Sequence, residues 1–183
     1  PVGSLSSTFT VKGQVVLADK DYIKQLTSVF KKAGIEIDGI VPNVLSEREL
    51  VLDRNELTDN VMILDIGAGN TDIGVFEGKS FVYTNTIPLG GDNITSDIAY
   101  VFNISEEEAD RLKSFIDNDT DIILNTYKGE ERTKTIKSSE LIEVIEARVE
   151  EMFSLVNKDI TNAGVKANIN NDWQTTSAGQ KRL

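Results

Sequence analysis

The chain has 183 residues, of which 39% are hydrophobic and 27% are charged, with a formal net charge of −11 at pH 7. This composition is ordinary for a globular protein, and the length suits one domain or two small lobes. The acidic balance argues against nucleic acid as a direct partner, because phosphate contacts need clustered Lys and Arg. The absence of Cys and His excludes disulfides, thiolate or histidine zinc sites, and Ser-His-Asp catalysis. Any catalysis would therefore use carboxylates, Lys, hydroxyls, backbone amides or a bound cation.

The first third of the chain predicts short elements around one amphipathic helix. A β-branched stretch at residues 9–18 predicts one strand or a bent pair of strands. Apolar side chains recur at helical spacing from Asp19 to Ala33, which predicts a helix. Alternating apolar residues from Ile35 to Val41 predict a strand, and a second short helix is expected from Asn43 to about Leu52.

The middle of the chain predicts three consecutive strands. The stretch from Val61 to Ile66 is a nearly unbroken apolar run, as expected of a buried central strand. A turn at residues 67–70 leads into a second strand, Thr71 to Phe76. A Glu-Gly-Lys turn then leads into a third strand, Ser80 to Pro88. These assignments place a glycine-rich turn directly after a buried strand.

The last third of the chain is mainly helical. A helix is expected from about Asn93 to Phe102, and a Ser-x-x-Glu capping box predicts another at residues 105–115. Short strand-like pieces follow at residues 122–127 and 133–136. A continuous apolar stripe then predicts a long helix from Ser139 to Ala163.

The stretch LDIGAGNTDIGVF, residues 64–76, is the main candidate for chemistry. Its glycines let an anion approach the backbone, and successive N–H groups in such a turn can bind it. Asp65 and Asp72 flank the turn and could hold a hydrated Mg²⁺, which prefers a few carboxylates together with substrate phosphates. A simple β-hairpin with solvated aspartates is the alternative on this spacing.

Two common nucleotide motifs do not fit this stretch. The dinucleotide fingerprint Gly-x-Gly-x-x-Gly needs a third glycine and a following helix, but Asp72 takes that position and a strand follows. A Walker A loop needs Gly-Lys-Ser/Thr after the first glycines, and none follows here.

The pattern Asp-x-Gly-x-Gly-x-Thr/Ser-Asp between two strands resembles the second phosphate motif of the actin-like ATPases, which include sugar kinases, Hsp70 chaperones and actin. The matching residues are Asp65, Gly67, Gly69, Thr71 and Asp72. Three flanking segments resemble the bacterial cell-division family FtsA, a branch of that superfamily. They are LADKDYIKQLTSVFKKAGIEIDGIVPNVLSERELVL, TIPLGGDNITSDIAYVFNISEEEADRLK and SSELIEVIEARVEEMFSLVNKDI, and the similarity covers roughly residues 1–164.

In that family, ATP sits between two lobes. The resemblance implies that the β- and γ-phosphates would face Gly67, Ala68, Gly69, Asn70 and Thr71. Asp65 and Asp72 would organise Mg²⁺ through water. Gly90 and Gly91 would lie close to the nucleotide, where a side chain would intrude. On local sequence alone, Gly90-Gly91 fits a helix-entry turn equally well.

Departures from the family pattern bear on activity. Family members commonly have Thr at the position of Asn70, and Gln-Pro where this chain has Pro42-Asn43, at a site that could orient the attacking water. Asn43 and Asp65 are therefore the catalytic candidates, and ATP hydrolysis stays open because Asn is shorter than Gln. The first phosphate motif, the adenosine-packing Gly-Gly-Gly segment and the membrane helix of the family find no match. We therefore expect a fragment, inactive alone, with Pro1 as a cut or processed start.

The expected fold class is α/β, an actin-like ATPase (ribonuclease H-like) lobe with a mixed sheet, flanking helices and a small α+β subdomain. The expected boundaries assign residues 1–18 to a strand region, 19–58 to the end of the N-terminal lobe, 59–92 to the C-terminal-lobe sheet with its phosphate loop, 93–138 to the small subdomain, 139–164 to the long helix and 165–183 to a tail.

The resemblance also implies partners. Full-length family members would link filaments of the tubulin-like protein FtsZ to the cytoplasmic face of the membrane at the division site. Residues 93–138 would receive the FtsZ tail, the protein would self-associate into actin-like filaments, and membrane contact would use parts absent from this chain. Basic candidates for binding an acidic tail are Arg111, Lys113, Lys128, Arg132 and Lys134. A non-enzymatic interaction module and another actin-like ATPase, of the type IV pilus assembly kind, remain as alternatives.

Overall fold

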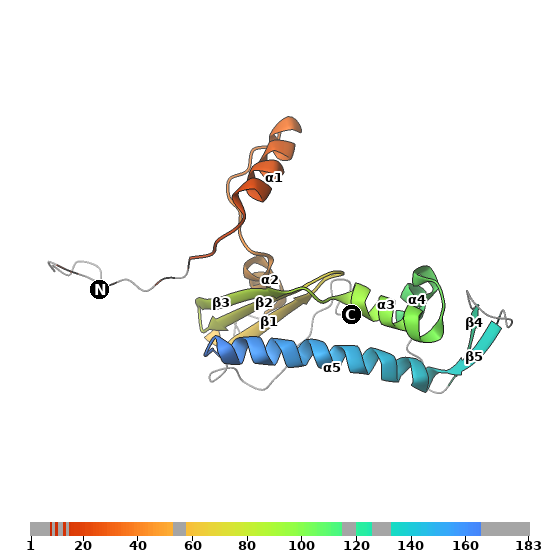
Figure 1. Ribbon diagram of the computed structural model, residues 1–183. Coiled ribbons are helices and arrows are strands. Elements are labelled where there is room, and N and C mark those ends of the chain that lie inside the picture. Colours follow the sequence, from red (N-terminus) through yellow and green to blue (C-terminus); the bar gives the residue numbers. More distant parts are fainter. Residues whose placement is uncertain are drawn as a thin grey trace. The chain divides into compact units, whose positions relative to one another are not determined.

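The structure is a computed structural model, and it describes residues 8, 10, 13, 15–52, 58–114, 120–125 and 133–165. The chain divides into two compact units, Pro1–Pro42 and Asn43–Leu183. Each unit is described by itself, and Figure 1 labels the elements of both. Most of the predicted tail at residues 165–183, and residues 53–57 of the expected N-terminal lobe, lie outside the described part.

The first unit contains helix α1 (Lys20–Lys32), as predicted. The carboxylate of Asp19 accepts hydrogen bonds from the N–H groups of Asp21 and Tyr22, which satisfies two of the free donors at the helix start. Gly34, with a φ of +75°, follows the helix end. None of the α1 side chains is buried within this chain.

The predicted strand from Ile35 to Val41 is wrong, because these residues have no regular structure. The same is true of residues 15–18 in the predicted strand at 9–18, whose remaining residues lie mostly outside the described part. A strand exists only when it pairs with a neighbour, and the described residues of this unit offer none. Alternating apolar or β-branched residues are therefore not sufficient to predict a strand in this unit.

The second unit is built on an antiparallel sheet of three strands in the order β1-β2-β3. These strands are β1 (Val61–Ile66), β2 (Thr71–Glu77) and β3 (Ser80–Ile87), within a residue of the predicted bounds. All strand pairs in the described residues are antiparallel. The mixed sheet expected from the sequence would need a parallel neighbour, which the described strands do not include.

Helices cover both faces of this sheet (Figure 1). On one face, Val44 of α2 (Asn43–Val51) packs with Ile63 and Phe76. The approach is close, since a Cβ on Gly74 would lie 2.8 Å from the Cβ of Val44. The opposite face packs on α5 (Ser138–Asn162), and the buried residues of that layer are Leu64, Ile73, Val75, Ile87, Val156 and Ile160.

Beyond the sheet, a smaller α+β group packs on the first turns of α5. It comprises α3 (Gly91–Phe102), α4 (Glu106–Lys113) and a hairpin of β4 (Asp121–Asn125) and β5 (Thr133–Lys137). Its buried core consists of Ile98, Phe102, Ile104, Ala109, Leu112, Leu124, Ile136 and Leu141. The predicted N-cap of α4 is present, because Ser105 Oγ accepts from the Glu108 N–H at 3.0 Å, and Glu108 Oε1 accepts from the Asn125 N–H at 3.3 Å. No helix in the described ranges is both long and apolar enough to cross a membrane.

Candidate functional site

The glycine-rich turn joins β1 to β2, and the sheet register fixes what flanks it. Asp65 lies directly opposite Asp72, and Ile66 lies opposite Thr71 as the closing pair of the hairpin. Side chains alternate between the two faces of a sheet. Ile63 faces α2, so Asp65 and Asp72 project on the α2 side of the sheet.

The turn itself presents open backbone donors. The N–H of Gly67 donates to the carbonyl of Asn70 at 2.9 Å, which closes the turn. Ala68, Gly69 and Asn70 are exposed, and within the described residues their N–H groups donate to no protein acceptor. A Cβ placed on Gly69 would meet no atom within 4 Å. Successive free amides of this kind form a site for an anion.

The same turn is joined to the start of α3 by its carbonyl groups. The Gly91 N–H donates to Gly67 O at 2.9 Å, and the Asp92 N–H donates to Ala68 O at 2.8 Å. Gly90 is buried at this junction, and a Cβ there would lie 2.4 Å from Ala68 O and 2.6 Å from Gly67 O. The Gly90-Gly91 pair is thus a helix entry, as one of the two sequence interpretations had it, and the hairpin itself requires Gly90.

Asp72 is held in place by two side chains. Its Oδ1 accepts from Thr86 Oγ1 at 2.6 Å and from Asn70 Nδ2 at 3.2 Å. Asn70, which departs from the family pattern, therefore orients a carboxylate beside the turn.

Glu47 on α2 is a further acidic residue at this site that the sequence did not reveal. Burial raises its pKa to about 7, and a hydrogen bond with Asp65 and the charges of Asp65 and Asp72 add to the shift. Glu47 lies four residues after Asn43, so both share a face of the helix. Asn43 is exposed at the first position of α2.

Among the described residues, no group of three or more acidic side chains is arranged to hold a metal ion directly. Asp65 and Asp72 nevertheless face each other across the hairpin. Two carboxylates beside a phosphate site suit Mg²⁺, which keeps several of its waters.

Lys113, at the end of α4, places a cation next to the Gly90-Gly91 entry. Its Nζ donates to Thr95 Oγ1 at 2.9 Å and to Gly91 O at 3.2 Å, and pairs with Asp110 at 2.8 Å. Its hydrogen bond and charge lower the pKa of the Asp110 carboxyl. The sequence marked Lys113 as a candidate contact for an acidic partner tail, and in the structure its Nζ bonds to Asp110 on its own helix and to Gly91 O and Thr95 on α3.

Comparison with known proteins now decides the family. Residues 62–179 match the family model described as cell division protein FtsA. The chain belongs to the FtsA family. It is 32% identical over 172 residues to FtsA of Bacillus subtilis, covering 90% of this chain and 39% of that protein. It is 29% identical over 168 residues to FtsA of Escherichia coli K12, covering 87% of this chain and 40% of that protein.

The chain thus spans about two fifths of the length of the curated FtsA proteins it matches.

Solved structures confirm the actin-like fold. MreB5 of Spiroplasma citri bound to ADP has a TM-score of 0.70 at 22% identity, over 88% of this chain and 55% of MreB5. A PilM-PilN type IV pilus biogenesis complex gives 0.61 at 14% identity, over 86% of this chain and 40% of that one.

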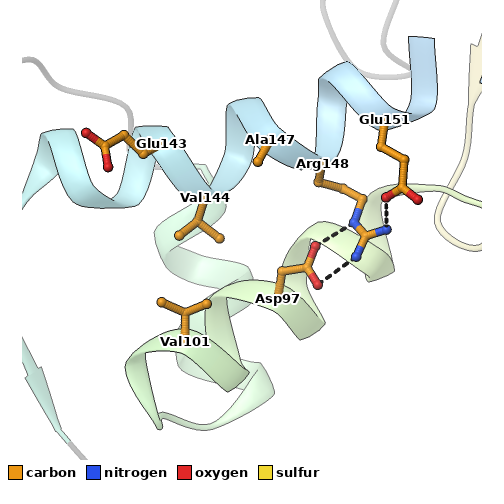
Figure 2. Close-up of a pocket in the computed structure, with 7 residues that line it drawn as sticks. All are labelled: Asp97, Val101, Glu143, Val144, Ala147, Arg148 and Glu151. Atoms are coloured by element: carbon orange, nitrogen blue, oxygen red, sulfur yellow. Dashed lines mark hydrogen bonds and ion pairs between the residues drawn. The ribbon is translucent and has the colours of Figure 1, made fainter. Parts of the chain in front are cut away.

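This FtsA-family chain also has an open groove of about 400 Å³ between α3 and α5 (Figure 2). Its lining residues are Asp97, Val101, Glu143, Val144, Ala147, Arg148 and Glu151. Arg148 pairs with both oxygens of Asp97 and with Glu151, so the guanidinium is held across the groove. The groove joins residues about fifty positions apart, which no local pattern could reveal.

Substituting Gly90→Ala should destabilise the second unit by roughly 1–3 kcal/mol, because the new Cβ collides with backbone carbonyls that cannot move away cheaply. The measurement is urea unfolding followed by circular dichroism. Gly91→Ala is the matched control, since a Cβ there would meet the flexible Lys113 Nζ at 3.5 Å and Gly67 O at 3.7 Å, both ordinary contact distances. Equal unfolding midpoints for the two variants would contradict the claim that the close approach of Gly90 to the hairpin carbonyls excludes a side chain.

Glu47→Gln should stabilise the protein at pH 8 and lose that advantage near pH 5. The pKa of Glu47 is raised from 4.5 to about 7 in the folded protein, so folding binds a proton between these values. Stability of the parent therefore falls as the pH rises through this window and stays low above it. The gain at pH 8 should be about 1 kcal/mol after solvent screening.

Urea midpoints between pH 5 and 8 test this, with Glu146→Gln on the exposed side of α5 as the control. A difference between parent and Glu47→Gln that does not change with pH would refute the assignment.

Proposed function

We propose that this chain forms one wall of an ATP site in an FtsA-type protein of bacterial cell division. The residues that would face the β- and γ-phosphates are Gly67, Ala68, Gly69, Asn70 and Thr71, with Gly90 and Gly91 beside the nucleotide. The observation that carries this proposal is the exposed turn whose N–H groups at Ala68, Gly69 and Asn70 find no acceptor among the residues that the structure describes. Exposed backbone amides bind the oxygens of a phosphate without needing a basic side chain.

Asp65 and Asp72 would hold Mg²⁺ through its water ligands. When bound, the ion would neutralise charge on the phosphates. Thr86 and Asn70 orient Asp72 for this role. Asp65 and Asn43 are the proposed catalytic residues, with Asp65 ordering water and Asn43 standing where the family places Gln.

The proposed site needs a second wall that this chain does not supply, since it spans about two fifths of its relatives. ATP bound between two lobes would contact this chain on one side only. We therefore expect the chain alone to bind MgATP weakly and to be inactive. MreB5, a neighbour in fold, has been solved with ADP and with AMPPNP, which supports a nucleotide in this fold.

Residues 93–138 would receive the tail of an FtsZ-type, tubulin-like partner, together with the facing part of α5. The groove between α3 and α5 has an apolar floor of Val101, Val144 and Ala147. Its one cation, Arg148, is already paired. An apolar segment of the partner therefore fits the groove better than a purely acidic one.

In its full-length form, the protein would self-associate into actin-like filaments and tether the partner to the cytoplasmic face of the membrane at the division site. Other parts of the protein would make the membrane contact. The alternatives are a non-enzymatic interaction module and a type IV pilus assembly protein. The PilM likeness supports the second only at the level of fold, and membership of the FtsA family favours the division role.

Titration of the ¹⁵N-labelled chain with MgATP should shift the amide resonances of Ala68, Gly69 and Asn70 first. AMP with Mg²⁺ should shift them much less, because it lacks the β- and γ-phosphates. Asp65→Asn should remove the Mg²⁺-dependent part of the shifts, whereas Asp121→Asn on exposed β4 should leave it intact. Shifts that avoid the turn, or micromolar affinity by isothermal titration, would contradict the proposed half-site.

Val101→Glu should weaken binding of a fluorescent FtsZ tail peptide about tenfold, or about 1.4 kcal/mol. Val101 lines the groove and is 52% exposed, so the new carboxylate would lie where an apolar contact is proposed. Leu50→Glu is the control, because Leu50 is 84% exposed on α2 and does not line the groove. Fluorescence anisotropy measures both affinities, and equal losses in the two variants would argue against this docking surface.

A further inference from the structure

A small cavity of about 60 Å³ lies between the sheet and the helices α3 and α5. Its lining residues are Leu64, Ile66, Thr71, Ile94, Val149, Met152, Phe153 and Val156. Thr71 is the single residue with a polar side chain among them, and its Oγ1 already donates to Leu89 O at 2.8 Å. The walls therefore present methyl, methylene and aromatic carbon.

The apolar lining determines whether water or an apolar ligand can occupy the cavity. Water in a buried cavity needs about 2–4 polar partners, and this cavity offers none beyond the occupied hydroxyl. In another protein, an engineered apolar cavity of about 150 Å³ stays dry and binds benzene or xenon. A cavity of this smaller size suits an apolar ligand of roughly two or three heavy atoms.

The lining side chains differ in burial. Leu64, Met152 and Val156 are buried, whereas Ile66, Ile94 and Val149 are only partly buried. The cavity therefore lies at the margin of the core, where Ile66 and Ile94 also pack against buried clusters.

We propose that this cavity is a binding site for a compact apolar molecule, such as a noble gas atom, dioxygen or a short hydrocarbon. The ligand would be held by dispersion contacts with the lining side chains alone. Ile66 and Thr71 form the closing pair of the phosphate hairpin, so an occupant would touch the base of that hairpin from the α5 side. The inference rests on packing, and it stands whether or not the hairpin binds ATP.

Xenon is the probe, and the chain supplies its own internal control. It has two methionines, Met62 and Met152, of which only Met152 lines the cavity. With ¹³C-methyl methionine labels, rising xenon pressure should move the Met152 resonance along a saturating curve. The Met62 resonance should show only the small linear drift of a pressure effect.

Two filling variants, Val149→Ile and Val156→Ile, each add one methylene group to the α5 wall of the cavity, two turns apart. Either one should abolish most of the Met152 shift, and circular dichroism checks that both remain folded. Equal, non-saturating shifts of both methionines would overturn the proposal. An unchanged Met152 shift in both folded variants would overturn it as well, since the xenon would then be elsewhere.

Discussion

Hydrogen bonds between the glycine-rich turn of the β1–β2 hairpin and the start of α3 join the sheet to the smaller α+β group, and the rest of the second unit depends on this junction. Gly91 and Asp92 donate to the carbonyls of Gly67 and Ala68. These bonds satisfy donors that a helix start leaves free, and they turn the carbonyl side of the hairpin inward. The amide side then remains open, which is the arrangement that an anion site requires. A single substitution at Gly90 would force the two elements apart.

Because side chains alternate between the faces of a sheet, the hairpin carries acidic side chains on the α2 side and borders an apolar cavity on the α5 side. On the α2 side, Asp65 and Asp72 meet Glu47, whose pKa is raised first by burial and then by its hydrogen bond with Asp65 and the charges of both aspartates. On the α5 side, Ile66 and Thr71 border a dry cavity. The acidic side chains and the apolar cavity thus lie on opposite faces of one hairpin.

Much of this could be predicted from local sequence. The strands around the turn, the capped helix at Ser105 and the long helix α5 follow from short-range periodicity and turn residues, and they appear within a few residues of expectation. The positions of Glu47, Lys113 and the groove at Arg148 could not be predicted, because each depends on contacts between distant elements. The strand expected at residues 35–41 failed for the same reason, since pairing is not encoded in one segment.

Amide hydrogen exchange measured by NMR on the chain alone is the most direct test of this arrangement. This arrangement predicts slow exchange at Gly91 and Asp92, whose N–H groups are bonded to the hairpin. It also predicts fast exchange, near that of an unstructured peptide, at Ala68, Gly69 and Asn70. Fast exchange at Gly91 and Asp92 combined with protection at Ala68 and Gly69 would contradict it, because the donors of the turn would then be used within the protein.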